Sequence, residues 1–256
     1  MAAVRRLVGL SLLLISLSAC GGSAPERVDL ADASARTVAE ETARFQLSIA
    51  GTIAGTSVRS TENGTVSFAR PRAHVYKLPP GGAFPQEVVV DGPFTYANAN
   101  VEAALHDRTV KPWTKLDARR LTPAQRRQRP DELAHVRALA YLSDGVRRAK
   151  RIGPASLDGE PATRFRGDVE PDRVAERAPA SQRAAIRAAV RNDFLDRPFE
   201  ADFWVDREGR VRRVRAAYRT TRGGRIAVDG RFSDFGAPVD VRLPPRRSIE
   251  ELDPTA

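Results

Sequence analysis

Cysteine, histidine and aromatic residues are scarce in this sequence. The shortages of cysteine and histidine exclude several kinds of site. A single cysteine cannot form a disulfide framework within the chain or build a Cys-rich zinc site. The three histidines, His74, His106 and His135, lack the spacing of a His-x-x-x-His metal motif. No Gly-x-Ser-x-Gly nucleophile motif occurs either. We therefore expect a protein that is not an enzyme and that has no metal and no cofactor.

Long apolar runs are also rare, and the clearest one lies at the start of the chain. Leu7–Ala19 spans 13 residues, fewer than the roughly 20 that a transmembrane helix needs. It follows Arg5 and Arg6, and this basic-then-apolar order is typical of a secretory signal. The run ends in Leu-Ser-Ala-Cys, which resembles the bacterial lipobox, where the signal is cleaved before a cysteine that then carries diacylglycerol. An ordinary signal peptide with an incidental cysteine is the alternative, but Cys20 is the chain's one cysteine.

The N-terminal sequence predicts that the chain is divided into three parts. Residues 1–19 are a lipoprotein signal peptide, residues 20–29 a lipidated tether, and residues 30–250 one domain. Acyl chains on Cys20 would hold the protein on the extracytoplasmic face of the cell membrane. The short tether is rich in Gly, Ser and Pro and reaches roughly 30 Å when extended, so the domain should lie close to the membrane.

The net charge of +10 falls to +8 when the predicted signal is removed. Only four basic residues are lysines, and abundant arginine, alanine and proline indicate the codon usage of a GC-rich genome. A solvated arginine-rich surface is the simplest interpretation. Attraction to anionic lipid headgroups is the alternative. Nucleic-acid binding is not expected in an exported chain without interleaved aromatic residues. The clusters that would attract headgroups are Arg126, Arg127, Arg129; Arg147, Arg148, Lys150, Arg151; and Arg210, Arg212, Arg213, Arg215.

Hydrophobic periodicity predicts strands, then helices, then strands. Helices are expected over residues 30–44, after Thr122-Pro123 through residue 140, and over 181–195. Period-two alternation elsewhere predicts strands, including residues 146–152 and 239–243. Hairpin turns are expected at Asn63-Gly64, Asp91-Gly92, Asp158-Gly159 and Gly223-Gly224. This order is typical of an α+β domain in which helices gather on one side of an antiparallel sheet.

Five segments together resemble the LppX/LprA/LprF/LprG lipoproteins of actinobacteria, relatives in fold of the lipoprotein carrier LolA. The resemblance implies a curved antiparallel half-barrel sheet, with helices over its concave face and an apolar cavity between. The arginine-rich stretch 119–129 departs from the family pattern. The segments are the lipobox at Cys20; Asp91-Gly92-x-Phe94-x-Tyr96 with Lys111-Pro112-Trp113-x-Lys115-Leu116; Asp158-Gly159-x-Pro161-Ala162-Thr163-Arg164-Phe165-x-Gly167; Phe203-Trp204-Val205-Asp206-x-x-Gly209-Arg210-Val211-x-Arg213; and Phe232-Ser233-Asp234-Phe235-Gly236-x-Pro238-Val239.

A cavity is also one of two interpretations of the apolar pattern itself. The predicted strands carry bulky apolar side chains, whereas the predicted helices are rich in alanine, so a thin cover could leave unfilled space. A packed core is the alternative, and only the resemblance favours the cavity. The residues expected to line it are Phe45, Leu47, Ile49, Val66, Phe68, Phe94, Tyr96, Phe165, Phe203, Val205, Val214, Tyr218, Val228 and Phe232.

The resemblance implies a protein that binds a lipid or acylated glycolipid in that cavity and carries it across the cell envelope. Its expected partners are this ligand and the membrane, with an envelope transporter or a secreted protein as a further candidate. The alternative is a non-enzymatic protein-interaction or envelope-sensing lipoprotein of the same fold, with the cavity filled or vestigial.

Overall fold

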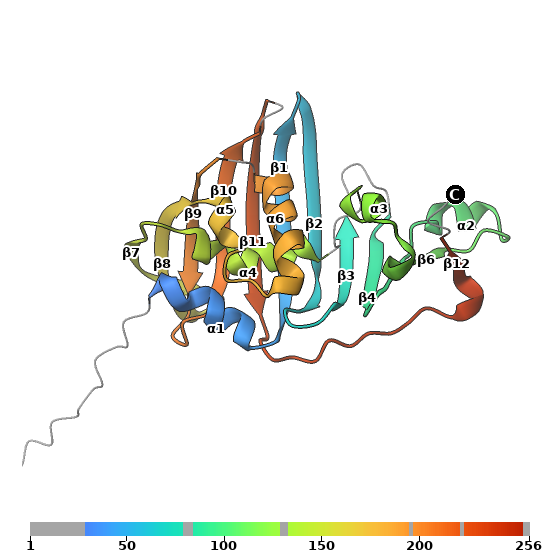
Figure 1. The fold of residues 1–256 in the computed structure, drawn as a ribbon, viewed down its shortest axis with the longest axis horizontal. Helices are drawn as coiled ribbons and strands as arrows, with labels where there is room; N and C mark the ends of the chain where they lie inside the picture. Colours follow the sequence, from blue (N-terminus) through green and yellow to red (C-terminus); the bar gives the residue numbers. More distant parts are fainter. Residues whose placement is uncertain (1–28, 79–83, 129–132, 195–196, 221–222, 253–256) are drawn as a thin grey trace, which may run out of the picture.

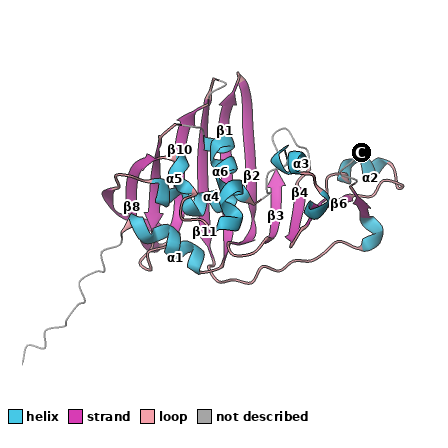
Figure 2. Ribbon diagram, in the orientation of Figure 1, coloured by secondary structure: helices cyan, strands magenta, loops and turns pink. Residues whose placement is uncertain are grey.

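A computed structural model describes residues 29–78, 84–128, 133–194, 197–220 and 223–252 of the chain. Cys20, the predicted signal peptide and nearly all of the predicted tether lie outside the described residues. The strands form one 12-stranded sheet in the order β12-β6-β5-β4-β3-β2-β1-β11-β10-β9-β8-β7. Neighbouring strands are antiparallel except β12 and β6. This open, curved sheet with a few helices is an α+β half-barrel, as predicted (Figures 1 and 2).

The elements follow the predicted order of strands, helices and strands. The strands are β1 Thr42–Ile53, β2 Thr56–Ser67, β3 Arg72–Leu78, β4 Gln86–Asp91, β5 Phe94–Ala97, β6 Trp113–Asp117, β7 Lys150–Leu157, β8 Glu160–Val169, β9 Phe199–Val205, β10 Val211–Arg219, β11 Arg225–Ser233 and β12 Ile249–Glu251. The α-helices are α1 Ala33–Ala39, α2 Val101–His106, α3 Pro123–Gln128, α4 Ala134–Tyr141, α5 Pro171–Val174 and α6 Ala180–Phe194. Short 3-10 helices include η1 Leu30–Asp32 and η3 Leu142–Gly145.

The two faces of the sheet differ because side chains alternate along each strand. In β1, Phe45 and Leu47 are buried, whereas Arg44, Gln46 and Ser48 are exposed. Helices α1, α4, α5 and α6 lie on the Phe45 side, which we call the covered face (Figure 1). The Gln46 side, which we call the open face, is crossed by the C-terminal segment, residues 234–248, on its way to β12.

The hydrophobic core lies between the covered face and the helices. The Phe68 and Phe232 rings meet edge to face with centroids 5.7 Å apart, a favourable aromatic arrangement. Helix α4 lies close to β11 because residue 230 is a glycine. A Cβ built on Gly230 would come within 2.7 Å of Leu139 Cδ1. The missing side chain therefore sets the distance between helix and sheet.

The predicted hairpin at Asn63-Gly64 is wrong. Both residues lie inside β2, paired with Gln46 and Phe45 of β1. A Cβ on Gly64 would lie 2.0 Å from the carbonyl oxygen of His74 in β3, so the glycine permits a close approach of two strands. The β1–β2 turn instead uses Ala54 and Gly55, both with positive φ.

Three further boundaries differ from the sequence prediction. The first helix ends at Ala39, and Glu41 has positive φ before β1 begins. Strand β7 starts at Lys150, since Val146 makes only an isolated bridge. Residues 239–243 lie in the C-terminal segment and form no strand, and β12 follows them. The turns at residues 91–92 and 158–159 are confirmed, and α6 matches the predicted helix 181–195.

Candidate functional site

Twelve of the fourteen apolar residues predicted to line a cavity lie together on the covered face. Eleven are buried members of one continuous hydrophobic cluster, and Ile49 packs against it half-buried. They come from β1, β2, β8, β9, β10 and β11 and the turn after β2. The structure therefore brings these side chains into one apolar surface beneath the helices.

Phe94 and Tyr96 lie on the opposite face. Tyr96 pairs with Val89, which pairs with His74 on the open face. Lys115 Nζ lies 4.8 Å from the centre of the Phe94 ring, within the range of a cation–π contact. Alternation predicted that these two residues point the same way. It could not say towards which face, because that depends on the register of each hairpin.

The helical cover combines small and large side chains. In α4, Ala134, Ala138 and Ala140 are buried beside Val136 and Leu139. The cluster receives Ile186, Ala189 and Val190 from α6. The expected alanine-rich cover is present, but leucine, isoleucine and valine contribute to it as well.

The apolar surface is less protected at its β1–β2 hairpin end. Ile49, Ile53 and Val58 are only half-buried there, although they pack against the cluster. Val58 pairs with Gly51, and Ile53 pairs with Thr56 across the hairpin. In Figure 1, β1 and β2 extend beyond α6 at this end. The apolar surface is therefore partly open to solvent at this end.

Two polar contacts fix α4 to β2 and the turn that follows it. Arg137, only 2% exposed, donates hydrogen bonds to the carbonyl oxygens of Ser67 and Arg70. His135 Nε2 lies 2.8 Å from Glu62 Oε2. Although burial opposes ionisation, the hydrogen bond and charge of His135 hold the pKa of Glu62 below its usual value. Nothing in the sequence set Arg137 apart from the other arginines.

Asp144 is a buried acid among α1, α5 and η3. Its side chain is 2% exposed and lies 3.5 Å from the Arg177 guanidinium. Burial raises the pKa of Asp144 to about 6, with the Arg177 charge opposing the rise. The hydroxyl groups of Ser34 and Ser143 are hydrogen-bonded nearby. These contacts join the N-terminal helix to the rest of the helical layer.

Neither a metal centre nor a membrane-spanning helix is found in the described parts of the chain. No group of three or more His, Cys, Asp or Glu side chains there could hold a metal ion. None of the helices described is both long enough and apolar enough to cross a bilayer. His74 and His135 are each paired with a carboxylate, Glu87 and Glu62.

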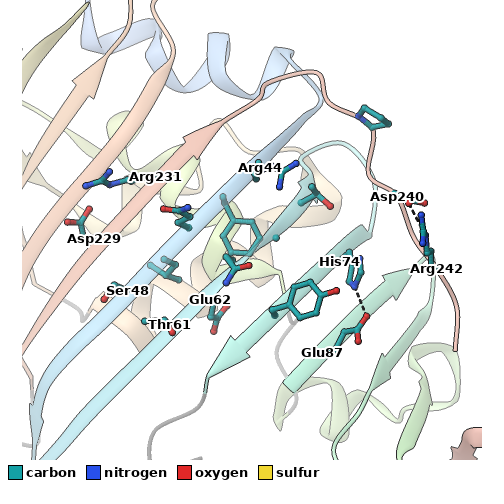
Figure 3. A pocket seen from close by; sticks show the side chains of 18 residues that line it. Arg44, Ser48, Thr61, Glu62, His74, Glu87, Asp229, Arg231, Asp240 and Arg242 are labelled. Carbon is teal, nitrogen blue, oxygen red and sulfur yellow. Dashed lines mark hydrogen bonds and ion pairs between the residues drawn. The ribbon is translucent and has the colours of Figure 1, made fainter. Parts of the chain in front are cut away.

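A polar pocket of about 970 Å³ lies on the open face. It is bounded by β1, β2, β3, β4 and β11 and by Pro238, Asp240 and Arg242 of the C-terminal segment (Figure 3). Its lining carries amide, hydroxyl and charged groups, in contrast to the apolar cluster on the other side of the sheet. This pocket was not predictable from the sequence, since its residues are scattered over five strands and a loop.

Comparison with known proteins shows a likeness in structure rather than in sequence. No family model matches the chain, and no curated protein matches it by sequence. The structure of LprF from Mycobacterium bovis is 12% identical, with a TM-score of 0.53 over 84% of this chain and 94% of that one. The lipoprotein LppX of Mycobacterium tuberculosis is 11% identical, with a TM-score of 0.50 over 83% of this chain and 98% of that one. The predicted resemblance is thus confirmed at the level of fold: the chain has an LppX/LprF-type half-barrel.

Proposed function

We propose that this chain is an envelope lipoprotein, held to the extracytoplasmic face of the cell membrane by acyl chains on Cys20. It binds a lipid or an acylated glycolipid between the sheet and the helices and carries it across the envelope. The observation that supports this best is the continuous apolar surface of the covered face, half-exposed at the β1–β2 hairpin end. LppX, which shares the fold, is itself a lipoprotein.

Burial of acyl chains provides the binding energy without a chemical step. Each buried methylene contributes about 0.8 kcal/mol, so ten of them would contribute about 8 kcal/mol before the cost of ordering the chain. Arg137 holds α4 to the other end of β2, at Ser67, and the Glu62–His135 pair holds it at mid-strand. The acyl chain therefore enters at the hairpin end, past Ile53 and Val58.

Native mass spectrometry of the full chain with Cys20→Ser tests this proposal. The variant lacks the acyl anchor, so it should leave the membrane fraction and still carry a non-covalent lipid. A consistently lipid-free protein would overturn lipid binding, and continued membrane attachment would place the anchor elsewhere. Transfer of a fluorescent lipid between donor and acceptor vesicles then tests carriage.

A matched pair of variants locates the entry. Val58→Asp puts a charge on the half-buried apolar surface. A bound acyl chain would remove water from this carboxylate, which is costly. Ser57→Asp puts the same charge on the neighbouring exposed residue of the opposite face. Lipid occupancy should fall at least about tenfold in the first variant and stay unchanged in the second. Equal occupancy in both would exclude entry at this end.

A further inference from the structure

The floor of the open-face pocket is a row of uncharged polar groups that crosses three strands. Gln46 of β1 is opposite Asn63 of β2, and Asn63 is opposite Tyr76 of β3. Neighbouring strands lie about 4.8 Å apart, so the two carboxamides and the phenol stand side by side. Ser48 and Thr61 form a second row beside them (Figure 3). The pocket thus offers closely spaced hydrogen-bonding groups on a rigid support.

Charged groups in the lining already have partners of opposite sign. Arg44 lies 2.9 Å from Asp234, Arg231 lies 3.6 Å from Asp158, and Arg242 lies 3.2 Å from Asp240. The carboxylates are paired as well: Glu87 with His74, Glu62 with His135, and Asp229 with Arg213 and Arg215. Each pair offsets the charge that would attract an anionic ligand or a cationic one. The lining therefore favours a ligand without net charge.

The uncharged groups, by contrast, are available to a ligand. Across the described residues, the side chains of Gln46, Asn63, Ser48 and Thr61 make no hydrogen bond to protein, and all four are exposed. A carboxamide both donates and accepts, and so does a hydroxyl group. These side chains match a ligand that carries many hydroxyl groups.

Tyr76 adds an aromatic surface to this row. It is 44% exposed, and its ring centroid lies 4.9 Å from that of His74. Burial and the Glu87 carboxylate raise the pKa of Tyr76, so the phenol stays protonated and can donate. Phe45 and Leu47 of β1 direct their side chains to the covered face, so the side chains that β1 presents to the pocket are polar or charged.

We infer that this pocket binds a neutral saccharide, with Gln46 and Asn63 hydrogen-bonded to ring hydroxyls and Tyr76 against the C–H face of a sugar ring. A volume of about 970 Å³ is within the range of small-molecule sites. The site lies across the sheet from the apolar cluster, so it is separate from the lipid site proposed above. The saccharide can be a free oligosaccharide or the sugar headgroup of a glycolipid in a membrane.

Titration calorimetry of the full-length protein tests the inference with two sets of soluble probes. The neutral set contains hexasaccharides of glucose, mannose and N-acetylglucosamine, and the anionic set contains hexagalacturonate and inositol hexakisphosphate. Phosphatidylcholine vesicles with or without digalactosyldiacylglycerol provide the membrane-bound sugar. Saturable binding of a soluble neutral saccharide would indicate a free oligosaccharide, and binding only to the galactolipid vesicles would indicate a headgroup.

Substitutions of pocket residues test whether saccharide binding takes place in the open-face pocket. Asn63→Ala and Tyr76→Ala change exposed side chains and should each weaken binding about five- to tenfold, as the loss of one or two hydrogen bonds predicts. Ser57→Ala, which lies outside the pocket, and Val58→Asp, on the covered face, should leave it unchanged. Failure of every neutral sugar to bind would overturn the inference. Binding insensitive to Asn63→Ala and Tyr76→Ala would overturn it too, as would an anionic probe that binds in an Asn63-dependent way. Because Val58→Asp affects only the lipid site, the two proposals can fail separately.

Discussion

Asp144 makes the stability of this protein depend on pH in a direction that can be measured. The ordinary pKa of an aspartate here is 3.8, and burial raises that of Asp144 to about 6. One pH unit between the folded and unfolded values corresponds to about 1.4 kcal/mol. The folded state therefore carries a penalty of about 3 kcal/mol once this carboxyl is ionised.

The sign follows from which form the fold prefers. Below about pH 4, Asp144 is protonated in both states, and the fold bears no penalty. Between about pH 4 and pH 6 the unfolded chain loses the proton first, so stability from this group falls as pH rises. Above pH 6 the full penalty is present. Asp144→Asn keeps the shape and stays neutral, so it should remove the penalty.

Urea unfolding of both proteins at pH 4, 5, 6 and 7.5, followed by tryptophan fluorescence, measures the effect. The free energy of unfolding of Asp144→Asn minus that of the wild type should rise by about 3 kcal/mol between pH 4 and pH 7.5. Acid effects of other carboxylates, such as Asp202 with its lowered pKa, act on both proteins and cancel. The exposed Asp168→Asn is the control and should change stability by less than about 0.5 kcal/mol throughout. A difference that stays constant with pH would refute the reasoning, because it would mean that Arg177 fully compensates the burial.

Two further substitutions test how β2 is held. Arg137→Met should lower the free energy of unfolding by about 3 kcal/mol, since it leaves the buried carbonyl oxygen of Ser67 and the part-buried one of Arg70 without this donor. Arg215→Met on the open face should change it by less than about 1 kcal/mol. A loss below about 1 kcal/mol at Arg137 would contradict this. Gly64→Ala should destabilise more than Gly55→Ala. The Cβ at position 64 would collide with the β3 backbone, whereas the Cβ at position 55 meets nothing within 4 Å and adds only the strain of a positive φ. A similar melting temperature for both variants would be inconsistent with the observed register.

The parts of the fold that could be predicted from sequence depend on local chemistry. Asp91-Gly92 and Asp158-Gly159 form turns because glycine accepts the positive φ that such turns need. Strand β9 was predictable because apolar and acidic residues alternate from Phe199 to Phe203. Helix α6 was predictable because its apolar residues recur at helical spacing over a long segment.

The parts that could not be predicted depend on contacts between distant residues. Asn63-Gly64 has the composition of a hairpin turn, yet its pairing with both β1 and β3 keeps it inside a strand. The direction of Phe94 and Tyr96 depends on the registers of β3, β4 and β5 together. The open-face pocket likewise exists only once β1, β2, β3, β4 and β11 lie together in the sheet and the C-terminal segment has crossed them.

The basic clusters show how sheet pairing changes the meaning of a charge count. In sequence, Arg210, Arg212, Arg213 and Arg215 resemble a positive patch that could attract anionic headgroups. In the structure, Arg210 contacts Asp206 at 2.8 Å and Glu40 at 3.1 Å, Arg213 and Arg215 share Asp229, and Arg212 donates to the Phe232 carbonyl oxygen. Nearby carboxylates therefore offset part of this cluster's charge, which weakens its long-range attraction at physiological ionic strength. The local ion pairs therefore make this cluster a weaker site for anionic headgroups than its sequence indicates.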